Sequence, residues 1–138
     1  MAAPWKSGSG EAGDGGMARA LTGRAGEALA QRHLEARGLR ILARNYRVAR
    51  GRSRPGGEID LVAVEPDGTL VFVEVRVRHG RMGGGAAASV GPAKQARLVH
   101  AARTWLAALP RVPPCRFDVV AVDGDRIEWL RAAFDAGD

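Results

Sequence analysis

The sequence has little cysteine and no long hydrophobic run. Cys115 is the single cysteine of the 138-residue chain, so no disulfide can form within it. Its place at the expected start of a strand suits a small apolar residue, and the three scattered histidines cannot complete a zinc site with it. No apolar stretch approaches the roughly 18 residues of a membrane span, and the N-terminus lacks the apolar core of a secretory signal. We therefore expect a cytoplasmic protein with no membrane partner.

Lysine is also scarce, although the chain is basic. There are 21 basic and 15 acidic residues, which give a formal net charge of +6, and only Lys6 and Lys94 are lysines. The arginines include two groups in stretches without any acidic residue, at 39–57 and 75–117. A polyanion favours clustered cations because phosphate binding releases counterions. The pattern indicates a nucleic-acid partner, and a solvated basic face with no partner is the alternative.

The length of the chain suits one domain. Residues 1–19 are rich in Gly, Ala and Ser and show little periodicity, so we expect a disordered tail followed by a single domain at 20–138. Hydrophobic periodicity predicts helices at 22–37 and 92–109 and a loop at 79–91. Thr22 can cap the first helix and Gly38 can end it.

Runs of β-branched and aromatic residues predict the strands. Four of them are expected at 39–48, 58–64, 70–77 and 116–122, and a short last one at 127–130. The order is one helix, three strands, one helix, one strand and a short final strand. This order indicates an α/β fold with a sheet flanked by helices.

Two predicted strands each place an acidic residue where the hairpin would bring them together. If the turn at 65–69 is symmetric about Asp67, then Asp60 and Glu74 lie directly opposite each other, with Cβ atoms about 4.5–5.5 Å apart. A register shift of one residue would break this pairing. Two bare carboxylates at that distance repel each other and are costly in a central sheet.

Two arrangements would remove this repulsion. A divalent cation held between Asp60 and Glu74 is one, because Mg²⁺ and Mn²⁺ prefer hard oxygen ligands. A structural ion network is the other, with Arg47, Arg76 or Arg78 neutralising the acids. The spacing alone leaves both open.

Two further charged residues share a predicted helix face with apolar residues. Glu27 shares a face with Ala30 and Leu34, which is either a site carboxylate or a surface glutamate favoured by the helix dipole. Lys94 lies four residues before Leu98, so it either projects toward the sheet or is an ordinary lysine of the first turn.

Four blocks of the sequence resemble the YraN-like family of uncharacterised bacterial proteins. They read GRAGEALAQRHLEARGLRILARNYR, GGEIDLVAVEPDGTLVFVEVRVR, VGPAKQARLVHAARTWL and RFDVVAV, and the resemblance covers about 21–134. The family is similar to the restriction-endonuclease-like PD-(D/E)XK nucleases and to Holliday-junction resolvases. The resemblance implies an αβββαβ core with a mixed sheet flanked by helices.

The resemblance also implies a catalytic site of Glu27, Asp60 and Glu74, with Asp60 and Glu74 as metal ligands for Mg²⁺ or Mn²⁺. The position two after Glu74 is normally lysine in such nucleases, and here it is Arg76. Arginine keeps the charge and can grip a phosphate, but it is a poor base because it stays protonated. Lys94 is a candidate to compensate, and the expected phosphate contacts are Arg47, Arg78 and Lys94.

Three functions follow from these patterns. The first is a metal-dependent DNA endonuclease that hydrolyses phosphodiesters, with branched DNA among its candidate substrates and a homodimer as a candidate assembly. The second is a non-catalytic nucleic-acid-binding module whose nuclease site is degenerate because of Arg76. The third is a structural or partner-binding protein with an internal ion network.

Overall fold

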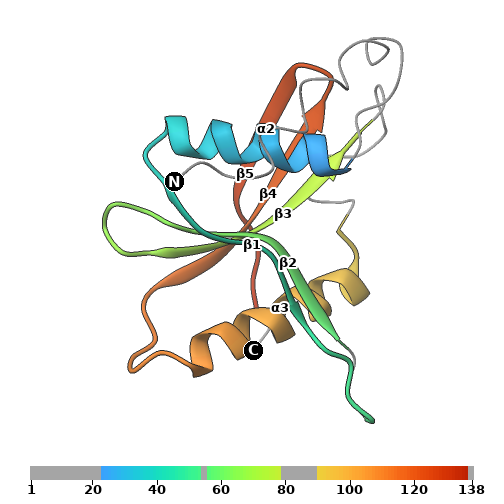
Figure 1. Ribbon diagram of the computed structural model, residues 1–138, viewed down its shortest axis with the longest axis vertical. Helices are drawn as coiled ribbons and strands as arrows, with labels where there is room; N and C mark the ends of the chain where they lie inside the picture. Colours follow the sequence, from blue (N-terminus) through green and yellow to red (C-terminus); the bar gives the residue numbers. More distant parts are fainter. Residues whose placement is uncertain (1–22, 54–55, 79–89, 137–138) are drawn as a thin grey trace.

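The computed structural model describes residues 23–53, 56–78 and 90–136. It shows a five-stranded sheet with one helix on each face (Figure 1). In chain order the elements are α2 (Gly23–Ala36), β1 (Arg40–Val48), β2 (Gly57–Val64), β3 (Leu70–Val77), α3 (Pro92–Ala107), β4 (Cys115–Asp123) and β5 (Arg126–Phe134). The predicted α/β class and element order are confirmed. The tail expected at 1–19, the Thr22 cap and most of the loop expected at 79–91 lie outside the described residues.

The strands stand in the sheet in the same order as in the chain. Strand β2 is antiparallel to both β1 and β3, β4 is parallel to β3, and β5 is antiparallel to β4. The parallel pair is possible because α3 carries the chain across the sheet between β3 and β4. The sheet is therefore mixed, and its helices and strands follow the αβββαβ order of a restriction-endonuclease-like core.

The hairpin between β2 and β3 has the predicted register. Val64 pairs with Leu70, and the ladder continues to Leu61 and Val73, so that Asp67 is its centre. The turn is fixed by Gly68, whose φ is 95°, a conformation that glycine adopts without strain. The Asp67 Oδ1 atom accepts a 2.9 Å hydrogen bond from the backbone N–H of Thr69. The turn therefore sets which residues face each other further along the two strands.

Helix α2 ends as its sequence predicts. Gly38 has a φ of 96°, its N–H donates to the Glu35 carbonyl at 3.0 Å, and the Leu39 N–H donates to the Leu34 carbonyl at 3.1 Å. This pair of bonds is the Schellman arrangement, which satisfies the last carbonyls of the helix. It also turns the chain directly into β1.

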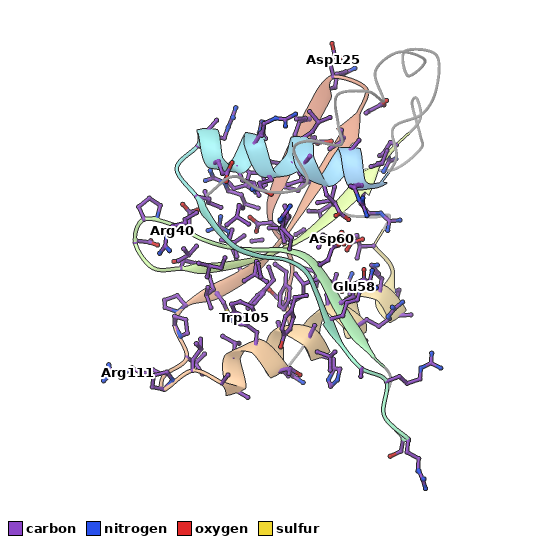
Figure 2. All side chains as sticks on the ribbon, in the orientation of Figure 1. Arg40, Glu58, Asp60, Trp105, Arg111 and Asp125 are labelled. Carbon is purple, nitrogen blue, oxygen red and sulfur yellow. The ribbon has the colours of Figure 1, made fainter. Side chains whose placement is uncertain are left out.

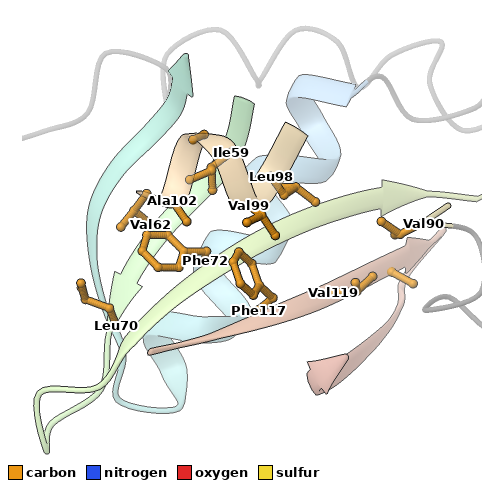
Figure 3. Close-up of a cluster of buried hydrophobic side chains, with 12 residues drawn as sticks. Ile59, Val62, Leu70, Phe72, Val90, Leu98, Val99, Ala102, Phe117 and Val119 are labelled. Carbon is orange, nitrogen blue, oxygen red and sulfur yellow. The ribbon is translucent and has the colours of Figure 1, made fainter. Parts of the chain in front are cut away.

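The sheet separates two hydrophobic clusters. Under α3, the buried side chains include Phe72, Leu98 and Phe117 (Figure 3). Under α2, the buried side chains include Leu34 and Val73. Burial of large apolar side chains on both faces gives the sheet a rigid position relative to both helices, with each fully buried side chain contributing about 1.5–3 kcal/mol.

One glycine determines how closely α3 approaches β2. A Cβ atom added at Gly57 would lie 2.9 Å from both the Arg97 carbonyl oxygen and the Ala101 backbone nitrogen. Because those atoms belong to the helix backbone, only glycine allows this separation. The close approach brings the first half of α3 next to the start of β2.

The last strand differs from the prediction. It was expected at 127–130, and it extends over Arg126–Phe134. The buried Asp118 carboxylate accepts hydrogen bonds from Trp129 Nε1 and from the backbone N–H of Ala132, both at 2.9 Å. These bonds hold an irregular position, where Ala132 has a φ of 51°, and the chain continues until Phe134 stacks on Phe117. The alanine-rich end of the strand carries no strand signal of its own.

A membrane-spanning helix is not found in the part of the chain that the structure describes, where no helix has the required length and apolar character.

Candidate functional site

Two acidic side chains from neighbouring strands meet at the point where the backbone pairing of β2 and β3 ends. The ladder stops at Leu61 and Val73, and Asp60 and Glu74 are the next residues on each strand. The Asp60 Oδ2 atom accepts a 2.8 Å hydrogen bond from the backbone N–H of Val75, which lies beyond the paired part of β2 and β3. Asp60 is 8% exposed and Glu74 is 3% exposed. The hairpin register therefore brings two buried carboxyl groups together.

The regular alternation of side chains along β2 is interrupted at Asp60. Ile59 packs in the same cluster as Val62, whereas Leu61 packs in the cluster under α2. The interruption lies opposite Asn45 of β1, which has a φ of 53°. Asn45 stands between Arg44 and Tyr46, which pair with β2, and is itself not among the paired residues. Simple alternation, which would place Asp60 with Val62 on one face, does not describe this part of the strand. At this irregularity the Asp60 carboxylate faces β3, where it accepts the Val75 N–H.

Glu27 of α2 approaches the pair from the other side of the sheet. Ala30 and Leu34, which share its predicted helix face, are fully buried, as expected. The pKa of Glu27 is raised by burial and by the charge of Asp60, and a hydrogen bond donated by the Asn45 side chain opposes the rise. Glu27 is thus close enough to Asp60 for the two charges to interact.

Two cations contact the buried Glu74. Arg76 Nη1 lies 3.2 Å and Lys94 Nζ 3.5 Å from the Glu74 Oε2 atom. Arg76 follows Glu74 on the same strand face, and Lys94 reaches it from the first turn of α3. Lys94 thus projects toward the sheet, and its role in compensating for Arg76 stays a prediction.

Burial disfavours the ionised form of both carboxyl groups. Burial raises the pKa of Glu74 to about 7, the charge of Asp60 adds to the rise, and the Lys94 ammonium opposes it. Burial also raises the pKa of Asp60, and the Val75 hydrogen bond opposes that rise. The interaction between the two side chains raises the pKa of Glu74 and lowers that of Asp60. Glu74 therefore changes its protonation state near neutral pH, and such shifted pKa values are typical of functional sites.

The other predicted phosphate contacts lie farther along the same elements. Arg47 forms an ion pair with Glu58, with 3.7 Å between Arg47 Nη2 and Glu58 Oε2, and its side chain is 70% exposed. Arg78 follows β3, and its backbone N–H donates to the Val122 carbonyl at 2.8 Å. Of the predicted cations, Arg76 and Lys94 contact the carboxyl pair, and Arg47 contacts a different glutamate.

The carboxyl pair fits a hard divalent cation that completes its coordination with water and substrate. Among residues 23–53, 56–78 and 90–136, no group of three or more His, Cys, Asp or Glu side chains is arranged to hold a metal ion by itself. Mg²⁺ characteristically binds through one or two carboxylates plus waters and phosphate oxygens, so two side chains suffice. A cation held by Asp60 and Glu74 would also offset the negative charge of Asp60, which raises the pKa of Glu74.

Sequence reasoning missed three residues around this site. Glu58 lies two residues before Asp60, and its charge raises the pKa of Asp60 and of Glu27. The Asn45 side chain of β1 forms a hydrogen bond with the Glu27 side chain of α2. Arg97 of α3 forms an ion pair with Glu58 at 3.8 Å. The spacing of Arg97 three residues after Lys94 was the available signal for a shared helix face.

The fold and the paired carboxyl groups place this chain among α/β proteins with a restriction-endonuclease-like core. Residues 26–122 match the model of Uncharacterised protein family UPF0102. A UPF0102 protein of Paracidovorax citrulli is 57% identical over 91% of this chain and 94% of its own. The UPF0102 protein of Cupriavidus taiwanensis is 60% identical over 86% of this chain and 86% of its own. That of Methylibium petroleiphilum is 56% identical over 90% of this chain and 93% of its own. The chain belongs to the UPF0102 family, which confirms the YraN-like membership that its motifs indicated.

Proposed function

We propose that this protein is a divalent-cation-dependent endonuclease that hydrolyses phosphodiester bonds of DNA, including branched DNA, in the cytoplasm. One observation carries the proposal. Asp60 and Glu74 form a buried carboxyl pair on neighbouring strands, with Glu27 close to Asp60 and Lys94 in contact with Glu74. A fold needs no such pair for its stability, because two adjacent buried acids oppose folding.

Each residue of the pair and its neighbours has a chemical role in this proposal. Asp60 and Glu74 would hold Mg²⁺ or Mn²⁺, and Glu27 would complete the coordination through water. Bound there, the cation would supply Lewis-acid chemistry, which activates water and offsets negative charge on the phosphate. Arg76 grips the phosphate through its planar guanidinium. Lys94 orients the attacking water beside Glu74.

We expect wild-type protein to cut DNA slowly in Mg²⁺ or Mn²⁺, and Asp60→Asn to reduce that rate at least about 100-fold, because the substitution removes charge where the reaction needs it. The measurement is cleavage of labelled junction, flap and linear DNA, with DNA affinity recorded for the same two proteins. Equal cleavage by wild type and Asp60→Asn would assign the activity to a contaminant and contradict the proposal.

A second candidate function is a nucleic-acid-binding module without catalysis. The observation in its favour is that Arg76 and Lys94 already neutralise Glu74 within the protein. Arginine at position 76 also cannot release a proton near neutral pH. Salt-sensitive DNA binding without cleavage of any tested structure would establish this function in place of the first.

A further inference from the structure

An open cavity of about 520 Å³ lies at the start of β2, and its lining includes Glu58, two residues before Asp60. Its lining includes three arginines, Arg47 from β1, Arg50 from the segment after β1 and Arg97 from α3, together with the single carboxylate of Glu58. Figure 2 shows Glu58 next to Asp60 on β2, near the end of the sheet where α3 begins. The cavity therefore adjoins the candidate site without belonging to it.

The glutamate holds two of the arginines around the cavity. Arg47 Nη2 is 3.7 Å from Glu58 Oε2, and Arg97 Nη2 is 3.8 Å from Glu58 Oε1, so each oxygen of the carboxylate faces one guanidinium. Each guanidinium carries five N–H donors, and one long ion pair engages only a part of them. The Arg47 and Arg97 side chains are 70% and 49% exposed, so their remaining donors are accessible to a ligand.

The charge of the cavity specifies an anion. Three arginines against one glutamate leave an excess of positive charge, and the Gly57 packing fixes Arg97 close to the strand. Planar guanidinium groups match the oxygens of phosphate through paired hydrogen bonds, better than a lysine could. The position is informative as well. Glu58 is two residues from Asp60, about 7 Å along a strand, which is comparable to one or two nucleotide steps.

We propose that the cavity formed by Arg47, Arg50 and Arg97 binds a phosphate of DNA that neighbours the phosphodiester presented to Asp60 and Glu74. Glu58 is the positioning residue that holds two of the arginines in place. This inference rests on the proposed function for the presence of DNA at the carboxyl pair. The phosphate belongs either to the continuous backbone or to a strand end, and the chemistry of binding is the same.

The test compares two double variants of equal charge. Arg50→Ala/Arg97→Ala removes two cavity cations, whereas Arg40→Ala/Arg111→Ala removes two exposed arginines that lie far from Glu58 (Figure 2). The probes are labelled duplexes with and without a 5′-phosphate, and fluorescence anisotropy gives Kd over a range of salt concentrations. We expect the cavity variant to bind at least about tenfold more weakly, with a salt slope lower by one to two, and the control to change by less than about threefold.

The outcomes separate the possible sources of the phosphate. An equal loss of affinity with both probes supports binding of a backbone phosphate, and a loss confined to the phosphorylated probe supports binding of a strand end. Equal weakening of the cavity variant and the control would show general attraction by net charge and overturn the inference. If cleavage depends on Asp60 while the cavity variant binds DNA like the wild type, this inference alone is overturned. Cavity-dependent binding without cleavage would overturn only the proposed catalysis.

Discussion

The Arg76→Lys variant is expected to cleave DNA about 100-fold faster than the wild-type protein in Mg²⁺, with a Kd for DNA that changes by less than about twofold. The substitution keeps a positive charge two residues after Glu74, on the same strand face and 3.2 Å from its carboxylate in the wild type. Binding should therefore survive. Lysine, unlike arginine, can lose a proton where burial lowers its pKa, and it can then assist the attacking water, which is worth about 10²–10⁴ in rate.

Single-turnover cleavage at saturating DNA separates this rate effect from binding. Arg111→Lys is the matched control, because it makes the same chemical change at an exposed arginine remote from the carboxyl pair (Figure 2). It should leave the rate unchanged. Rapid cleavage by the wild type that slows in Arg76→Lys would show that Arg76 is itself an adapted catalytic group. In that case Lys94 would not be compensating for a lost lysine.

The Glu74→Gln variant is expected to gain stability relative to the wild type as the pH rises. The folded-state pKa of Glu74 is about 7, above its ordinary value of 4.5, so the native state holds the proton more tightly than the unfolded chain does. The contribution of Glu74 to the free energy of unfolding is complete below about pH 4.5 and is lost as the pH rises through about 7. Glutamine cannot ionise, so the variant lacks this loss, which is on the order of 3 kcal/mol for the native protein without metal.

Urea unfolding at pH 5 and pH 8, with chelator present, measures this difference. Glu128→Gln is the control, since it removes an exposed glutamate of β5 and should follow the wild type at both pH values. Mg²⁺ added at pH 8 should stabilise the wild type and have no effect on Glu74→Gln, because a ligand stabilises only the state that binds it. Identical pH dependence of wild type and Glu74→Gln would mean that the buried pair does not share a proton.

The carboxyl pair could be predicted from the sequence because the turn between β2 and β3 determines which residues of the two strands lie opposite each other. The turn around Asp67 and Gly68 sets the register of β2 and β3, and that register makes Asp60 and Glu74 the next residues beyond the last pair of the ladder. The helix face of Glu27 was predictable for a similar reason, since Ala30 and Leu34 follow it at helical spacing. Periodicity and turn chemistry are local properties of the chain, and they carry this part of the site.

The remaining parts depend on contacts that no local pattern records. Asn45 has a positive φ within β1, and a strand pattern gives no sign of that irregularity or of its bond to Glu27. The end of β5 is held by the buried Asp118, which is distant in sequence from Ala132. The arginine cavity forms because Gly57 lets α3 pack closely on β2, and this packing appears only in three dimensions.

Titration with Mn²⁺ tests most directly whether the carboxyl pair is a metal site. The comparison is isothermal titration of wild type and of the Asp60→Asn/Glu74→Gln double variant, both shown to be folded by circular dichroism. Both substitutions keep the size of the side chains and their hydrogen-bonding capacity, and they remove the negative charges that attract a hard cation. We predict one Mn²⁺ site per wild-type chain and no binding heat for the double variant. Equal heats for the two proteins would contradict the assignment of Asp60 and Glu74 as the metal ligands.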